Sequence, residues 1–204
     1  MLYGRTNFSH RGIVNNVTYL MQKVPSLYTA FTVGDKYSSN PIVYGQVNPF
    51  VLKYNEVVEI VINNVNTDHN NLHPWHLHGH NFQVIERSPP QAGAFGTYAA
   101  NLSSTPVRRD TIMVNPNGYA VIRFRASNPG VWLFHCHIEW HVSSGLVATM
   151  IEAPDHLQDL KIPEDHLENC RAYGMATAGN AAGSVHDPLN LNGSVTQVPT
   201  NGHG

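Results

Sequence analysis

Two stretches of the chain concentrate side chains that bind metals. Residues 73–80 read His-Pro-Trp-His-Leu-His-Gly-His, and residues 135–141 read His-Cys-His-Ile-Glu-Trp-His. Imidazole rings are costly to bury without partners, so four histidines within eight residues are hard to explain as packing. A thiolate with imidazoles suits copper, zinc or an iron–sulfur centre. A strand with a buried cysteine could explain the second stretch alone, but the two stretches together predict a metal centre.

One subset of these side chains matches a blue-type copper site. Such a site takes one cysteine and two histidines in a trigonal plane, with a weak or absent axial ligand. Cys136 and His141 supply two ligands from one loop, and His73 supplies the third. The axial position falls at Leu146, which cannot donate, so we expect a high reduction potential. Leu146 would also serve as a core residue that opens the last strand.

The remaining histidines form two His-x-His pairs, His76 with His78 and His135 with His137. Alternate side chains of an extended segment leave on opposite faces, so the second pair should point away from Cys136. Two adjacent pairs would make half of a larger all-imidazole copper cluster. An electron arriving at Cys136 would reach that cluster through the adjacent backbone, as four-electron reduction of dioxygen to water requires.

The segments around these stretches predict an all-β structure. Short runs rich in Val, Ile, Thr, Tyr and Phe alternate with Pro and Gly, a pattern typical of a Greek-key β-sandwich. We expect strands at residues 13–20, 42–44, 50–53, 56–63, 81–86, 110–114, 119–125, 131–137 and 146–152. The strand at 56–63 is apolar on both sides, which predicts burial between two sheets. The polar loop 64–72 would deliver the first histidine stretch.

The predicted domain occupies residues 1–155, and residues 1–37 lead into it. Residues 156–204 hold few strand signals, so we expect an irregular tail with a short helix near residues 163–170. The Pro- and Gly-rich segment 88–106 should lie at the surface. His80 is out of register with the paired histidines, and we expect it to make a structural hydrogen bond.

Composition limits the possible partners and the compartment. Charged residues make up 13% of the 204 residues, the net charge is −2 and no basic run occurs, which argues against nucleic acid as a partner. Four Asn-x-Ser/Thr sequons favour a secreted glycoprotein, although no signal peptide follows Met1. They begin at Asn7, Asn16, Asn101 and Asn192. We therefore expect this chain to lack the N-terminal part of a longer protein. Cys170 would pair with a cysteine there or remain a free thiol.

The two histidine stretches resemble the C-terminal copper signatures of the multicopper oxidases, the family of laccases, ascorbate oxidase and fungal iron-transport ferroxidases. The resemblance extends from about residue 15 to residue 170. It implies a cupredoxin domain, the last of usually three. It also implies that His73, Cys136 and His141 are type 1 copper ligands. By the same resemblance His76 is a type 2 ligand, and His78, His135 and His137 are type 3 ligands.

The family takes the other histidines of its trinuclear cluster from its first domain, and this chain has no further His-x-His pair outside the two stretches. The resemblance thus implies a complete type 1 site and half of the type 2 and type 3 sites. We expect that the chain alone does not reduce dioxygen. Upstream cupredoxin domains or a partner chain would complete the cluster.

Finer details place the chain closer to the iron-transport ferroxidases than to wood-rotting laccases. They are Glu139-Trp140, residues 108–111 (Arg-Arg-Asp-Thr) and residues 128–132 (Asn-Pro-Gly-Val-Trp), although laccase-like pigment oxidases share many of them. Ferroxidases bind ferrous ion with a carboxylate beside the type 1 histidine. Asp68 is the candidate here, and a plain surface aspartate is the alternative. Glu139 resembles a carboxylate that assists proton delivery to the oxygen site, or else one that holds a histidine ligand.

The sequence therefore predicts a copper-dependent oxidase domain that is secreted or lies on the extracellular face of the plasma membrane. Ferrous ion or a phenol would give single electrons to the type 1 copper, and dioxygen would be reduced to water at the cluster. A stand-alone electron-transfer cupredoxin would leave the paired histidines unused. A copper or zinc storage module would lack intense charge-transfer colour.

Overall fold

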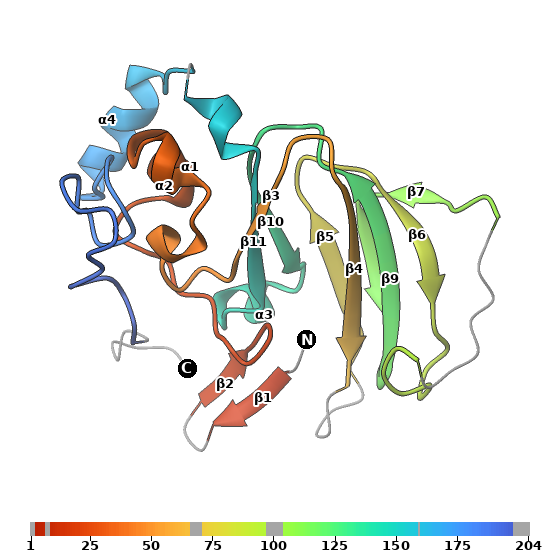
Figure 1. The fold of residues 1–204 in the computed structure, drawn as a ribbon. Coiled ribbons are helices and arrows are strands. Elements are labelled where there is room, and N and C mark those ends of the chain that lie inside the picture. Colours follow the sequence, from red (N-terminus) through yellow and green to blue (C-terminus); the bar gives the residue numbers. More distant parts are fainter. Residues whose placement is uncertain (1–2, 7–8, 66–70, 97–103, 159, 198–204) are drawn as a thin grey trace.

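The structure, a computed structural model, describes residues 3–6, 9–65, 71–96, 104–158 and 160–197 (Figure 1). Its strands are β1 (Tyr3–Thr6), β2 (Ser9–Gly12), β3 (Pro49–Leu52), β4 (Val57–Asn64), β5 (His73–Leu77), β6 (Phe82–Arg87), β7 (Arg108–Arg109), β8 (Thr111–Val114), β9 (Gly118–Arg125), β10 (Gly130–Cys136) and β11 (Val147–Glu152). Its helices are α1 (Ser26–Thr32), α2 (Asp35–Ser38), α3 (Glu139–Ser143) and α4 (Glu164–Ala172), with 3-10 turns η1 (Pro41–Tyr44) and η2 (Pro154–Leu157).

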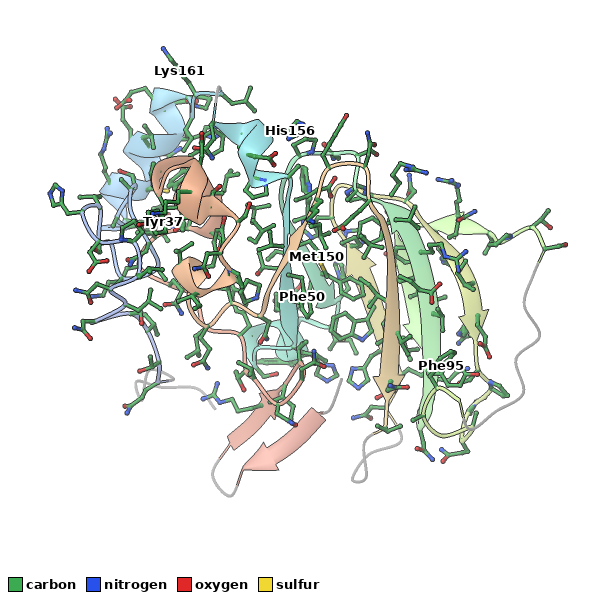
Figure 2. All side chains as sticks on the ribbon, in the orientation of Figure 1. Tyr37, Phe50, Phe95, Met150, His156 and Lys161 are labelled. Atoms are coloured by element: carbon green, nitrogen blue, oxygen red, sulfur yellow. The ribbon has the colours of Figure 1, made fainter. Side chains whose placement is uncertain are left out.

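Most of these strands form a sandwich of two sheets. One sheet has the order β3-β11-β10-β5-β8, and the other has the order β4-β9-β6-β7. Neighbours are antiparallel except β3 and β11, which run parallel and place Phe50 opposite Met150 (Figure 2). Strands β1 and β2 form a separate hairpin.

The core lies between the two sheets, where alternate residues of each strand turn inward. On β5 and β10 the inward residues include Trp75, Leu77 and Phe134, all at most 2% exposed, with the Trp75 and Phe134 rings 4.8 Å apart. Phe82 and Ile122 meet them from the opposite sheet. This packing fixes β5 and β10 beside each other, and these two strands carry four of the eight predicted ligand positions.

Helices cover the other face of the five-stranded sheet. Figure 1 shows α1, α2 and α4 on the side of β3, β10 and β11 that faces away from β4 and β9. A second apolar cluster fills this layer, built from Ala30, Val33, Val43, Tyr44, Val47, Ile151 and Leu157. Helix α4 confirms the short helix predicted near residues 163–170, and its first turn carries Glu164 and Asp165, which suit the positive end of the helix dipole. Among the described residues, no helix has the length and apolarity to cross a membrane.

Two expected strands near the N-terminus are wrong. Residues 13–20 do not form one strand, because Asn15 and Asn16 adopt left-handed backbone angles (φ 49° and 67°) and turn Val14 back to pair with Val17. Residues 42–44 lie in the 3-10 turn η1. The Asn40 side chain accepts a hydrogen bond from the Ile42 N–H, and Pro41 fixes the first turn.

One strand is absent from the prediction, and the burial predicted for another needs correction. Residues 73–77 form strand β5, because pairing with β8 and β10 outweighs the weak strand preference of its histidines and proline. The strand at 56–63 exists as β4 but is not buried on both faces. It lies at an edge of its sheet, so Val57 is 57% exposed and Val61 is 36% exposed.

Candidate metal centre

Strand pairing brings the two histidine stretches together. In the antiparallel register of β5 and β10, His76 lies opposite His135 and Trp75 lies opposite Cys136. Opposite residues share a face of the sheet, so Cys136 faces the core with Trp75, while His76 and His135 leave on the other face. The sheet thereby divides the predicted ligands into two groups.

The first group is His73, Cys136 and His141. The Cys136 Sγ atom lies 3.5 Å from His73 Nδ1 and 3.3 Å from His141 Nδ1, and the three ligand atoms lie within 4.8 Å of one another. At ordinary metal–ligand bond lengths, sulfur and nitrogen atoms at 120° around one ion stand about 3.8 Å apart. Shifts of a few tenths of an ångström would admit a metal ion, so the trio is consistent with a type 1 copper site.

Helix α3 positions His141 beside Cys136. Strand β10 ends at Cys136, and the helix begins three residues later, with the His141 N–H donating to the Ile138 carbonyl at 2.9 Å. The Leu146 N–H donates to the His141 carbonyl at 2.9 Å, and the Cys136 N–H donates to the Leu146 carbonyl at 3.2 Å. Leu146 is 3% exposed and presents no donor atom, as its predicted non-coordinating place requires.

Burial shifts the pKa values of all three side chains of the trio. Desolvation lowers the pKa of His73 to about 4, with a smaller contribution from charge repulsion by His141. Desolvation also lowers the pKa of His141, so both rings are neutral near pH 7, the form that binds metal. Burial raises the pKa of the Cys136 thiol to about 11, against a weaker opposite effect of the Ile138 N–H. A metal ion must therefore displace the thiol proton when it binds.

The second group is His76, His78, His135 and His137. Ring centroids are 4.9 Å apart for His76 and His78, 5.1 Å for His78 and His135, and 5.3 Å for His135 and His137. The Nε2 atoms of His78 and His135 approach to 3.0 Å. Desolvation, followed by repulsion between neighbouring rings, lowers the pKa of His78. Four imidazoles therefore converge on one face of the sheet, as predicted.

Hydrogen bonds orient two of these rings. His76 Nδ1 lies 3.0 Å from the Asp110 carbonyl oxygen and 3.0 Å from Thr111 Oγ1, and His135 Nδ1 lies 3.1 Å from the Cys136 carbonyl oxygen. A carbonyl only accepts, so each Nδ1 carries the proton and leaves the Nε2 lone pair for a metal. The sequence reading missed this role of Asp110 and Thr111. The pairing of β8 with β5 places them beside His76.

The turn after His78 is tightly constrained. Gly79 has φ +74°, and a Cβ there would lie 2.5 Å from the Trp132 ring. The Trp132 Nε1–H donates to the Asn128 carbonyl at 2.8 Å, which holds the ring in place. His80 Nε2 lies 2.6 Å from Glu152 Oε2, and the carboxylate is fully buried. The predicted structural hydrogen bond of His80 is confirmed.

The two predicted catalytic carboxylates have different outcomes. Glu139 is exposed in the first turn of α3, and its side chain has no hydrogen-bond partner among the described residues. Asp68 lies outside the described residues. The structure therefore brings together seven predicted ligand side chains, while the roles of both carboxylates stay predictions.

The two-sheet sandwich and the His-Cys-His trio agree with the comparisons to known proteins. Residues 19–156 match the multicopper oxidase family, and the chain belongs to that family. The predicted all-β cupredoxin-type fold is confirmed by the crystal structure described as Fet3p, a multicopper oxidase that functions in iron import. It superposes with a TM-score of 0.80 at 42% identity, over 87% of this chain and 35% of that one.

Fungal iron-transport oxidases are among its relatives. The chain is 53% identical to the iron transport multicopper oxidase fetC of Epichloe festucae over 187 residues, which are 89% of this chain and 29% of that protein. It is 50% identical to the iron transport multicopper oxidase FET3 of Gibberella zeae, over 88% of this chain and 29% of that protein. A laccase structure from Botrytis aclada matches with a TM-score of 0.50 at 34% identity, over 62% of this chain and 24% of that one. The chain thus spans less than a third of these curated relatives.

Proposed function

We propose that this chain is the type 1 copper domain of a fungal-type iron-transport oxidase that oxidises ferrous ion and reduces dioxygen to water. One observation carries the proposal: two imidazole Nδ1 atoms and one thiol sulfur converge within 4.8 Å in a relative of iron-transport multicopper oxidases. Copper held there would accept single electrons from the reductant.

The predicted type 1 ligands have separate roles in copper binding and electron transfer. His73, Cys136 and His141 would hold the type 1 copper, with Leu146 as a non-coordinating axial neighbour. Cys136 is joined through the backbone to His135 and His137. It therefore forms the shortest covalent connection between the type 1 site and the second group of rings.

His76, His78, His135 and His137 would supply half of the type 2 and type 3 copper ligands. Their convergence supports this assignment, and so do the Nδ1 contacts of His76 and His135, which leave each Nε2 lone pair directed away from the backbone carbonyls. The other ligands would come from upstream cupredoxin domains or a partner chain. Glu139 is exposed on the turn that follows His137, a position from which it would assist proton delivery to bound dioxygen.

Ferrous ion is favoured over a phenol as the reductant. The superposition on Fet3p covers 87% of the chain, whereas the laccase superposition covers 62%. Asp68, five residues before His73, would help to bind ferrous ion. In the polypeptide that carries this chain, Asp68→Ala should raise the KM for ferrous ion and leave the KM for a phenol unchanged.

The protein would act outside the cell, secreted or on the plasma membrane. Two of the sequon asparagines lie among the described residues, and both Asn16 and Asn192 are exposed, as attachment of a glycan requires.

Copper loading of the purified chain tests the central assignment. The wild-type chain should bind copper and develop intense visible absorption, because a short copper–thiolate bond produces that colour. Cys136→Ser should abolish the absorption with an unchanged far-UV circular dichroism spectrum. Cys170→Ser is the matched control and should remain coloured, because the Cys170 thiol lies outside the trio and donates to the Tyr28 hydroxyl at 3.5 Å. A coloured Cys136→Ser protein would refute the assignment.

A further inference from the structure

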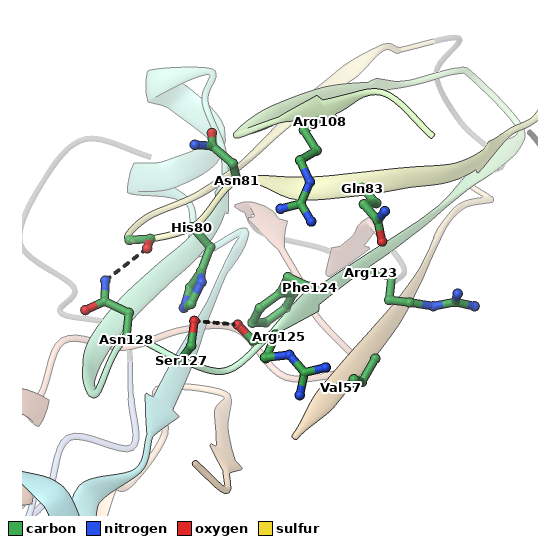
Figure 3. A pocket seen from close by; sticks show the side chains of 11 residues that line it. Val57, His80, Asn81, Gln83, Arg108, Arg123, Phe124, Arg125, Ser127 and Asn128 are labelled. Carbon is green, nitrogen blue, oxygen red and sulfur yellow. Dashed lines mark hydrogen bonds between the residues drawn. The ribbon is translucent and has the colours of Figure 1, made fainter. Parts of the chain in front are cut away.

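A pocket of about 400 Å³ lies beside the four-stranded sheet and contains none of the seven predicted copper ligands (Figure 3). Strands β4, β6, β7 and β9 line it, together with the turns around residues 79–81 and 127–128. Its volume falls within the range of about 300–1,000 Å³ that is usual for small-molecule sites. The pocket is therefore large enough for a small ligand that carries several charged groups.

Three guanidinium groups give the pocket its charge. They belong to Arg108 on β7 and to Arg123 and Arg125 on β9. In Figure 3 the Arg108 side chain extends between His80 and Gln83, whereas Arg123 points away from the other labelled side chains.

These three arginines differ in how far they are neutralised. The Arg123 guanidinium pairs with Glu59, with a nitrogen–oxygen distance of 2.5 Å, so its charge is already compensated. One nitrogen of Arg125 donates to the Asn55 carbonyl at 2.8 Å, which leaves its charge uncompensated. The Arg108 guanidinium group has no hydrogen-bond or ion-pair partner within the described part of the chain. Two positive charges from different strands thus remain available to a ligand.

The other polar lining groups suit the same kind of ligand. The described lining residues include no carboxylate, and the amides of Gln83, Asn81 and Asn128 can donate further hydrogen bonds. Asn128 uses one of its amide hydrogens on the Gly79 carbonyl at 3.0 Å, which holds its side chain at the rim. The nearby Glu152 carboxylate is hydrogen bonded to His80 and is fully buried, so it does not face a ligand.

We propose that this pocket binds a small polyanion with at least two carboxylate or phosphate groups. Guanidinium groups bind both kinds of oxyanion through paired, charge-assisted hydrogen bonds. Arg108 and Arg125 stand on separate strands, so each can hold a different anionic group of one ligand.

Titration calorimetry on the purified chain tests the site, with tricarballylate, pyrophosphate and inorganic phosphate as probes. Tricarballylate or pyrophosphate should bind more tightly than phosphate, and the affinity should fall as salt is added. Whichever binds more tightly tells whether carboxylate or phosphate groups are preferred. Arg108→Gln and Arg125→Gln should each weaken that binding about tenfold, because each removes a charge-assisted pair. Arg171→Gln is the matched control and should bind like the wild type, since Arg171 lies on α4 and pairs with Glu164.

Three results would overturn the proposal. They are no binding of either polyanion, equal affinity for phosphate and the polyanions, and equal weakening in all three variants. Because the Arg108 side chain is exposed and has no partner among the described residues, Arg108→Gln should keep the wild-type urea midpoint. A loss of binding in this variant is then not a loss of fold.

Discussion

The unfolding free energy of the chain without copper should fall when the pH is lowered from 7 to 5, because His73 is buried. His73 is 2% exposed, and burial lowers its pKa to about 4 from an ordinary value of 6.5. The unfolded chain therefore binds a proton first, so the loss of stability begins near pH 6.5 and is complete below the folded-state pKa. For these two pKa values, a single site changes the unfolding free energy by about 2 kcal/mol between pH 7 and pH 5.

Urea unfolding in the presence of a chelator, followed by circular dichroism at both pH values, measures this loss. His73→Phe removes the titrating ring, and its pH-dependent loss should be smaller than that of the wild type by about 2 kcal/mol. His73→Gln is a second variant with no titrating group. Other ionisable groups remain in all three proteins and cancel in the comparison. Equal losses in wild type and both variants would refute the link between burial of His73 and acid sensitivity.

Three further outcomes follow from the site. Leu146→Met introduces a thioether at the predicted axial position, and its similar volume preserves the fold. A redox titration should show a lower reduction potential for the bound copper. An unchanged potential would contradict the axial assignment. Gly79→Ala should reduce the unfolding free energy by about 3 kcal/mol, because the new Cβ would meet Trp132 2.5 Å away. Gly34→Ala is its control, since Gly34 also has a positive φ but nothing within 4 Å of a Cβ, and an equal loss in both variants would exclude the contact as the cause. Copper at about a thousand times its dissociation constant should raise the unfolding free energy by about 4 kcal/mol, and chelation should reverse the gain in a thermal melt.

Much of the fold could be predicted from sequence, since alternating apolar residues bounded by turn signals mark β6, β9, β10 and β11 directly. Strand β5 was missed because its stability comes from two neighbouring strands rather than from its own residue types. The exposure of β4 was also missed, because a local pattern does not reveal which strand lies at the edge of a sheet.

The sequence by itself predicted the donor set and a copper centre, because ligand chemistry belongs to side-chain types and to their alternation along extended backbone. Only the tertiary structure decided that His73 reaches Cys136 across 63 positions of chain and that Asp110 and Thr111 orient His76. It also decided that Arg108 and Arg125 share a pocket, although they stand 17 positions apart in the chain. The physical reason is that strand register and sheet order arise from pairing over the whole chain, and distances between remote side chains depend on that pairing.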